Sequence, residues 1–218
     1  MNDSASLGGG YASARPDPQP TARAVLAAAH AGAPHARLVV LAGPPGVGKS
    51  SVAAELIRRQ PESLLIDKDR TAGGFILEAA ALRGDGADSA YAADHYWQRL
   101  RPLEYAGAMR LACDNLVARR QVLLVGGWGP ELGIDALWSD LCQRLHPSPL
   151  CVLHLDPPAH AAWRARLAAR GSRCDAPYFE ELARNTGNLP VWAGAIRLST
   201  EGRLENVVQR ALDALTTP

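Results

Sequence analysis

The stretch RLVVLAGPPGVGKS, from Arg37 to Ser50, decides the fold of this 218-residue chain. Its first half is a short apolar run, and such a run closed by a glycine loop predicts a buried strand. Its second half, GPPGVGKS at residues 43–50, matches the pattern G-x-x-x-x-G-K-[ST]. That pattern is typical of a loop that binds phosphate between a strand and a helix. The sequence therefore predicts a strand, a phosphate-binding loop and a helix in succession.

Each residue type in this loop has a chemical reason. Gly46 and Gly48 let the main chain wrap closely, so that several N–H groups can point at one phosphate. Lys49 can place a cation on the β- and γ-phosphates of a nucleotide, and the Ser50 hydroxyl can bind Mg²⁺. The alternative, a glycine turn that merely joins a strand to a helix, would not need Lys and Ser at these positions. We therefore expect ATP to be bound by Gly43, Pro44, Pro45, Gly46, Val47, Gly48, Lys49, Ser50 and Ser51.

Beyond the loop, apolar runs alternate with segments of helical spacing. Short runs at residues 64–66, 122–125, 150–155 and 195–199 predict four further strands. Strands that alternate with helices favour a parallel sheet covered on both faces. We therefore expect an α/β fold of three layers, in which a five-stranded parallel sheet lies between two layers of helices.

The N-terminal residues differ in composition from the rest of the chain. The first 20 residues are rich in Gly, Ser, Ala and Pro and carry few large apolar side chains. Such a segment cannot bury enough surface to offset the entropy lost on ordering. We expect residues 1–35 to form a flexible extension, with a possible short helix at residues 21–31, and residues 36–218 to form the main domain.

The composition of the whole chain excludes several classes of protein. Apolar residues make up 47% of the sequence, which argues against disorder of the whole chain. The formal net charge of +1 argues against a protein that coats long nucleic acids or anionic membranes. No apolar stretch approaches the ~20 residues of a membrane helix, and four scattered cysteines are typical of a reducing compartment. We therefore expect a cytoplasmic protein whose partner is a small molecule, and the sequence carries no signal for its oligomeric state.

Two carboxylates follow the second predicted strand, in the sequence LLIDKD at residues 64–69. Residues two apart on an extended segment point the same way, so Asp67 and Asp69 could face one crevice. Ligands bind at the carboxyl ends of parallel strands, where the phosphate-binding loop also lies. Asp69 could orient and deprotonate an acceptor hydroxyl, and Asp67 could help to hold Mg²⁺. The alternative is a turn in which these side chains cap the next helix.

A phosphate-binding loop followed by a strand that ends in D-x-D resembles the P-loop small-molecule kinases. Shikimate kinases, zeta-toxin kinases, gluconate kinases and chloramphenicol phosphotransferases share this layout. The sequence RLAARGSRCD at residues 166–175 is similar to the lid of these enzymes, and the resemblance covers about residues 36–215. It implies a nucleoside-monophosphate-kinase-like fold with a helical acceptor-binding insert at about residues 71–119 and an arginine-rich lid at about residues 164–176.

The resemblance also implies an activity. ATP and Mg²⁺ would be the cofactors, and the γ-phosphoryl group would pass to a hydroxyl of a small metabolite or antibiotic. Asp69 would orient the acceptor, and Ser50 and Asp67 would hold the metal. Lys49 and Arg170 would complete the catalytic set. Arginine suits this role because its guanidinium group matches phosphate oxygens and stays charged. Arg166, Arg170 and Arg173 would close over ATP, and the alternative for these arginines is a solvated helix face.

Aromatic and polar side chains cluster in the expected insert, and Trp128 lies in a glycine-rich loop after the third predicted strand. Aromatic walls with hydrogen-bonding groups suit a polar, hydroxylated small molecule. The alternative for the aromatic side chains is packing in the core. We therefore expect acceptor contacts from Asp67, Asp69, His95, Tyr96, Arg101, Tyr105 and Trp128.

The third predicted strand departs from many P-loop proteins, which end this strand in an aspartate that holds the metal through water. Here the strand ends at Val125 and runs into glycines. Either Asp67 and Ser50 carry the metal, or Glu131 reaches back to it. We interpret Asp156, after the fourth strand, as a strand-end turn residue.

Other functions remain as alternatives to the small-molecule kinase. A switch or motor NTPase would need a catalytic Asp-Glu pair after a strand, and Pro157 follows Asp156 here. A nucleotide or polynucleotide kinase would use the same loop, but near-zero net charge argues against long nucleic acid. A degenerate nucleotide-binding protein would bind ATP without turnover.

Overall fold

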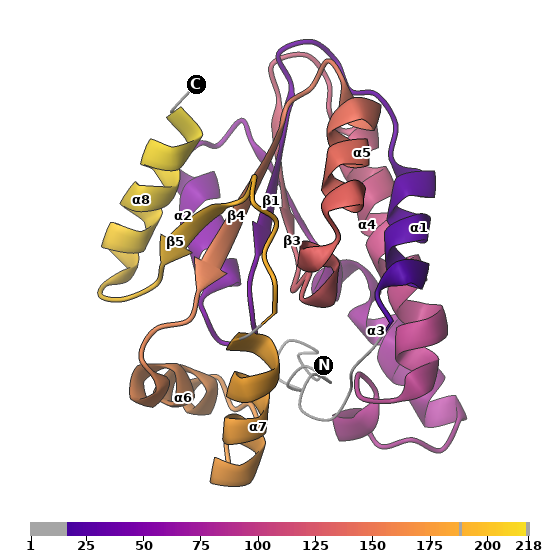
Figure 1. Ribbon diagram of the computed structural model, residues 1–218, viewed down its shortest axis with the longest axis vertical. Helices are drawn as coiled ribbons and strands as arrows, with labels where there is room; N and C mark the ends of the chain where they lie inside the picture. The colour runs from indigo at the N-terminus through magenta and orange to yellow at the C-terminus, as the bar shows by residue number, and fades with distance from the viewer. Residues whose placement is uncertain (1–16, 188, 217–218) are drawn as a thin grey trace.

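The computed structural model describes residues 17–187 and 189–216. Within them, five parallel strands form one sheet in the order β2-β3-β1-β4-β5 (Figure 1). The strands are β1 (Arg37–Ala42), β2 (Leu64–Asp67), β3 (Gln121–Val125), β4 (Leu150–Asp156) and β5 (Ile196–Ser199). The predicted α/β fold with a five-stranded parallel sheet is confirmed.

The central strand, β1, is buried on both faces. It pairs with β3 on one side and with β4 on the other, so that Leu38 lies between Val122 and Leu150. Leu38 and Val40 pack into the core on one face of the sheet, whereas Val39 and Leu41 pack into the core on the other. This pattern explains why the strand is apolar at consecutive positions, since the helices of parallel crossovers cover both faces.

Two layers of helices cover the sheet (Figure 1). Helices α2 (Lys49–Arg59) and α8 (Leu204–Thr216) lie on one face. Helices α1 (Gln19–Ala28), α4 (Arg101–Asp114) and α5 (Asp135–Leu145) lie on the other. Helices α6 (His160–Ala169) and α7 (Ala176–Gly187) lie near the carboxyl end of the strands, below the sheet in Figure 1. Within the described residues, no helix combines the length and apolar character that a membrane crossing requires.

The segment between β2 and β3 is helical. Helix α3 (Lys68–Leu82) follows β2 directly, and a short 3₁₀ turn at Ala87–Ser89 and a π-helical turn at Tyr96–Leu100 lead into α4. Gly84 has a φ of 79° after the end of α3, which is a conformation that glycine adopts without strain. This geometry explains the break in helical pattern near residues 84–86.

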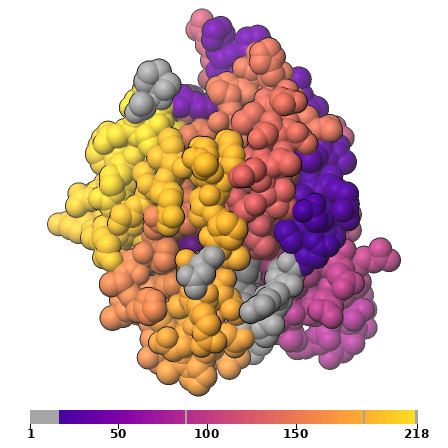
Figure 2. Space-filling model, in the orientation of Figure 1, coloured from indigo at the N-terminus to yellow at the C-terminus, as the bar shows by residue number. Residues whose placement is uncertain are grey.

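The predicted boundary of the main domain at residue 36 is wrong for helix α1. Val25 is fully buried, and α1 packs against α4 and α5 in the same core as β1. Figure 2 shows the indigo surface of α1 lying flush with the neighbouring helices. Small alanine side chains such as Ala22 let the helix approach closely, so an alanine-rich segment that looked like an extension completes the second layer. Residues 1–16 of the expected extension lie outside the described residues.

Helix α5 was not predicted from the sequence. Its buried residues are Leu137, Trp138, Leu141 and Leu145, which recur at helical spacing along one stripe. The signal was therefore present in the sequence, and the glycine-rich loop before it obscured the start of the helix.

Candidate active site

The phosphate-binding loop joins β1 to α2, and its glycines adopt conformations that other residues avoid. Gly46 has a φ of 80° and Gly48 a φ of 101°. A Cβ on Gly46 would lie 2.7 Å from Cδ2 of Leu167 on α6, so this glycine also allows α6 to pack against the loop. Gly48 directly precedes α2. The free N–H groups in the first turn of this helix therefore lie at the loop.

Lys49 lies in the loop it is expected to serve. Its ammonium donates hydrogen bonds to the carbonyl oxygens of Gly43 and Pro44, each at 2.9 Å. Burial lowers the pKa of Lys49 to about 8, and the positive charge of Arg170 adds to this effect, while the carboxylate of Asp69 opposes it. The Lys49 ammonium is therefore held against the loop by two carbonyl oxygens.

Asp67 ends β2 and caps α3. Its Oδ1 accepts a hydrogen bond from the backbone N–H of Asp69 at 3.1 Å, and its Oδ2 accepts one from the Ser50 hydroxyl at 3.3 Å. Burial raises the pKa of Asp67, and the nearby charge of Asp69 raises it further. The expectation that both acids lie on one extended segment is therefore wrong, because the chain turns into α3 at Lys68 and Asp67 takes the capping role.

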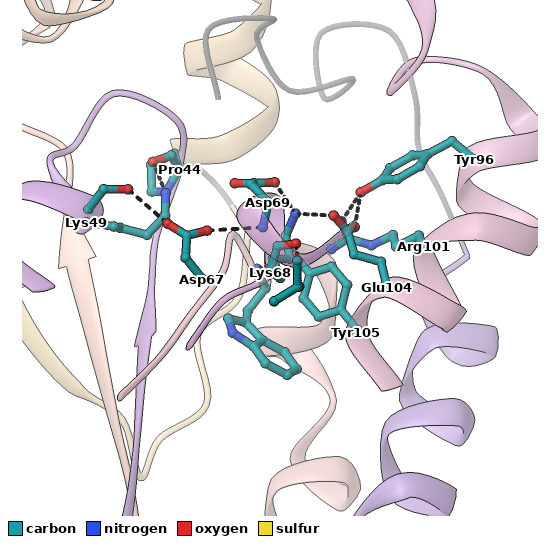
Figure 3. A network of polar contacts seen from close by, with 12 residues as sticks. Pro44, Lys49, Asp67, Lys68, Asp69, Tyr96, Arg101, Glu104 and Tyr105 are labelled. Atoms are coloured by element: carbon teal, nitrogen blue, oxygen red, sulfur yellow. Dashed lines mark hydrogen bonds and ion pairs between the residues drawn. The ribbon is translucent and has the colours of Figure 1, made fainter. Parts of the chain in front are cut away.

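Asp69 lies in the first turn of α3, beside a buried lysine that the sequence analysis did not single out. The ammonium of Lys68 donates to Oδ1 of Asp69 at 2.6 Å (Figure 3). Burial would raise the pKa of Asp69, but the charge and hydrogen bond of Lys68, together with the charges of Lys49 and Arg170, lower it. Asp69 is thus held as a carboxylate at the edge of the loop.

A cavity of about 590 Å³ opens over the phosphate-binding loop. Its lining joins five separate parts of the chain: the loop and α2, the acidic pair with Arg70, the end of β3, the end of α6, and the start of α8. The volume falls in the range of small-molecule and cofactor sites. The lining residues are Gly46, Val47, Gly48, Lys49, Ser50, Ser51, Val52, Asp67, Asp69, Arg70, Val125, Arg166, Ala169, Arg170, Gly202, Leu204 and Val207.

Three predicted residues of the loop contribute through their carbonyl groups and do not line the cavity. Gly43 and Pro44 accept hydrogen bonds from Lys49, as described above. Pro45 accepts a hydrogen bond at 2.7 Å from the indole of Trp163, a buried residue of α6. Trp163 was missed by the sequence analysis, because a tryptophan on a helix carries no signal for a contact with a distant loop.

The three arginines of the expected lid have different surroundings. Arg166 lines the cavity and donates to the carbonyl of Thr200 at 2.8 Å, which ties α6 to the segment that precedes α8. Arg170 also lines the cavity and donates to the Ser172 hydroxyl at 3.0 Å. Arg173 lies outside the cavity lining, where it pairs with Asp175 at 2.7 Å and stacks on the ring of Tyr178. The expectation that Arg173 closes over the nucleotide is not met by this arrangement.

Four of the predicted acceptor contacts are core residues. Tyr96, Arg101, Tyr105 and Trp128 are each at most 3% exposed, and the cavity lining includes none of them. The Tyr105 hydroxyl accepts a hydrogen bond from the backbone N–H of Trp128, and the two rings pack edge to face. The packing alternative is therefore correct for these aromatic side chains, since they bury apolar area, and the hydroxyls of Tyr96 and Tyr105 find hydrogen-bond partners within the core. His95 is half-buried and also lies outside the cavity lining.

Glu131 and Asp156 are engaged elsewhere. Glu131 is fully buried, and its two oxygens accept hydrogen bonds from Arg101 at 3.0 and 2.7 Å. The suggestion that Glu131 reaches back to a metal is therefore wrong. Asp156 pairs with His154 at 2.8 Å and with Arg197 at 2.9 Å, which agrees with its interpretation as a strand-end residue.

The donor set beside the loop fits Mg²⁺. The Ser50 hydroxyl and an Asp67 carboxylate oxygen lie within hydrogen-bond distance of each other on the cavity wall, and Mg²⁺ prefers oxygen ligands. Within the described residues, no group of three or more acidic, histidine or cysteine side chains could enclose a metal. This arrangement agrees with the usual mode of Mg²⁺ binding, in which one or two protein oxygens act together with phosphate and water.

Comparisons with known proteins place this geometry in a family. Residues 38–185 match the family described as AAA domain. A gluconokinase from Sinorhizobium meliloti 1021 superposes with a TM-score of 0.53 at 17% identity, over 84% of this chain and 93% of that chain. A sugar kinase from Janibacter sp. HTCC2649 gives 0.50 at 22% identity, over 83% and 94%. A shikimate kinase from Bacteroides thetaiotaomicron gives 0.50 at 17% identity, over 83% and 99%. No curated protein sequence matches the chain.

The family match spans more than half of the chain and includes the phosphate-binding loop, the acidic pair and the helices that carry the arginines. The superpositions cover more than four fifths of the chain at low sequence identity, so they show a shared fold. This chain therefore belongs to the AAA domain family and has the fold of the P-loop small-molecule kinases.

Proposed function

We propose that the protein is an ATP-dependent phosphotransferase that moves the γ-phosphoryl group of ATP to a hydroxyl group of a small molecule. The observation that carries this proposal is the shared cavity over the loop, where Lys49, Asp69 and Arg170 face one space. Phosphoryl transfer needs an anion-binding cradle, cationic side chains at the transferred group and a carboxylate for the acceptor, and this cavity offers each of them.

In this mechanism the loop amides and the N-terminus of α2 bind the triphosphate. Lys49 exchanges its carbonyl partners for phosphate oxygens, and Arg170 stabilises the charge that spreads over the transferring group. The carboxylate of Asp69 accepts a hydrogen bond from the acceptor hydroxyl and aims its oxygen at the γ-phosphorus. The new O–P bond forms as the bond to the β–γ bridging oxygen breaks, ADP leaves, and the acceptor proton passes to Asp69.

Ser50 and Asp67 would hold Mg²⁺, which neutralises phosphate charge when it is bound. The raised pKa of Asp67 reflects burial beside Asp69, and a cation at this place would favour its charged form. The hydroxyl and the carboxylate lie on two different elements, α2 and β2, so they would bring the end of the phosphate loop and the acidic pair to one ion.

The acceptor class follows from chemistry and from likeness. Asp69 and the loop select a hydroxyl group as the nucleophile, and the fold is shared with a gluconokinase, a sugar kinase and a shikimate kinase. We therefore propose a polar, hydroxylated metabolite as the acceptor, with a hydroxylated antibiotic as the second choice. Gly202, Leu204 and Val207 also line the cavity, and we place the nucleotide base beside them.

The experiment that tests the proposed function measures ATP consumption with and without acceptors. Purified protein is incubated with ATP, Mg²⁺ and a panel of sugars, sugar acids, shikimate and hydroxylated antibiotics, and phosphate gain is followed by mass spectrometry. A phosphotransferase forms ADP and a phosphorylated product only when its acceptor is present. Basal hydrolysis that no acceptor stimulates would instead indicate a switch NTPase, and neither reaction would indicate a nucleotide-binding protein. Lys49→Ala serves as the control that identifies a contaminating kinase.

A further inference from the structure

A buried lysine connects the cavity to the core of the helical insert. The ammonium of Lys68 lies 2.6 Å from Oδ1 of Asp69 and 3.0 Å from Oε1 of Glu104 on α4. The side chain of Lys68 is 7% exposed and that of Glu104 is fully buried, whereas that of Asp69 is 34% exposed and lines the cavity. One ammonium therefore joins a carboxylate at the active site to a carboxylate that water does not reach.

Glu104 is itself fixed. Its second oxygen accepts a hydrogen bond from the Tyr96 hydroxyl at 2.7 Å, and Arg101 lies 3.5 Å from that hydroxyl (Figure 3). Arg101 is locked in turn by its paired hydrogen bonds to Glu131. Glu104, Tyr96, Arg101 and Glu131 are all buried and hydrogen-bonded. The Glu104 carboxylate is therefore held in one position beside Lys68.

We propose that Lys68, anchored by Glu104, is a positioning residue that fixes the Asp69 carboxylate at the acceptor side of the cavity. The proposal rests on the proposed phosphotransferase function and gives the buried aromatic and charged residues of the insert a role in it. These residues do not contact the acceptor. They hold Lys68, which in turn holds the Asp69 carboxylate that faces the acceptor. Holding a catalytic group in place matters because a misplacement of about 1 Å can reduce the rate about 100-fold.

The electrostatic surroundings of Asp69 agree with this role. The groups that act on its charge are Lys68 in α3, Lys49 in α2, Arg170 at the end of α6 and Asp67 in β2. Burial would raise the pKa of Asp69, and Lys68 is the strongest influence that lowers it. Burial would likewise lower the pKa of Lys68, but the carboxylates of Asp69 and Glu104 outweigh burial and raise it. Both partners therefore stay charged near neutral pH.

The test compares Lys68→Met with the double variant Lys68→Met/Glu104→Gln. Lys68→Met removes the ammonium and keeps an unbranched side chain one atom shorter, but it leaves Glu104 buried without its cation, which costs stability. The double variant removes both charges, so that no buried carboxylate is left without a cation, and stability should return. If Lys68 were merely structural, activity would return together with thermal stability in the double variant. Positioning instead predicts that stability returns while kcat/KM for the acceptor found in the panel stays about 100-fold low, with the affinity for a nonhydrolysable ATP analogue unchanged.

Recovery of activity together with stability in the double variant would overturn the positioning role. Absence of any acceptor-stimulated reaction in the wild type would instead overturn the proposed function. The two failures are therefore distinguishable.

Discussion

Asp69 is the side chain on which the proposed chemistry depends most directly. Asp69→Asn keeps the size of the side chain and removes its charge and its ability to accept a proton. We expect kcat to fall about 100-fold or more, with little change in ATP affinity, because the loop and not Asp69 binds the phosphates. Steady-state kinetics and calorimetric titration with a nonhydrolysable analogue measure the two effects. Wild-type turnover in this variant would remove Asp69 from the mechanism.

The affinity of the protein for ATP should depend on pH because of Lys49. Because its pKa lies at about 8, the side chain is a cation below that pH and becomes neutral above it. We therefore expect the affinity for ATP to weaken as the pH rises from 7.5 to 9.5, by at most about tenfold per pH unit. Calorimetric titrations across this range measure the effect. In Lys49→Arg, which stays charged throughout, any residual affinity should be independent of pH.

Helix α1 belongs to the second layer of the molecule, and its contribution to stability can be measured at one residue. Val25→Ala removes two methyl groups from a fully buried position, so we expect the free energy of unfolding to fall by about 2 kcal/mol. Arg23→Ala, an exposed change in the same helix, is the matched control and should have little effect. Urea denaturation provides the measurement. Equal values for the two variants would mean that α1 does not pack in solution.

The whole molecule should respond to nucleotide, because the cavity is built from the phosphate loop, α6 and the start of α8. A nonhydrolysable ATP analogue with Mg²⁺ at 100 times its Kd should stabilise the folded state by about 2.7 kcal/mol. That corresponds to a rise in Tm of about 5–10 °C for a chain of this size. Differential scanning calorimetry with and without a chelator separates the contribution of the metal. Ser50→Ala should reduce the part of the shift that depends on Mg²⁺, and an unchanged metal-dependent shift would remove Ser50 from the metal site.

Local sequence was sufficient for the fold and for the phosphate loop. The run from Leu38 to Ala42 is apolar at every position, so it could be predicted as a buried strand before any partner was known. The loop after it carries its function in consecutive residues, from Gly43 to Ser50, since backbone amides and glycine conformations are set locally. The same reasoning overlooked the packing of α1, because an alanine-rich segment looks alike whether it is solvated or buried.

The surroundings of Asp69 were decided by contacts between residues far apart in the chain. Lys68 meets Glu104 across 36 positions, and Arg101 meets Glu131 across 30. No local pattern shows whether a tyrosine such as Tyr96 faces a ligand or another side chain, because both environments favour an aromatic ring with a polar end. A phosphate loop binds with its own backbone, whereas a positioned carboxylate needs a buried counter-charge from another element. For this physical reason the sequence alone could predict a phosphate-binding loop, whereas the tertiary structure decided which side chains pack behind Asp69.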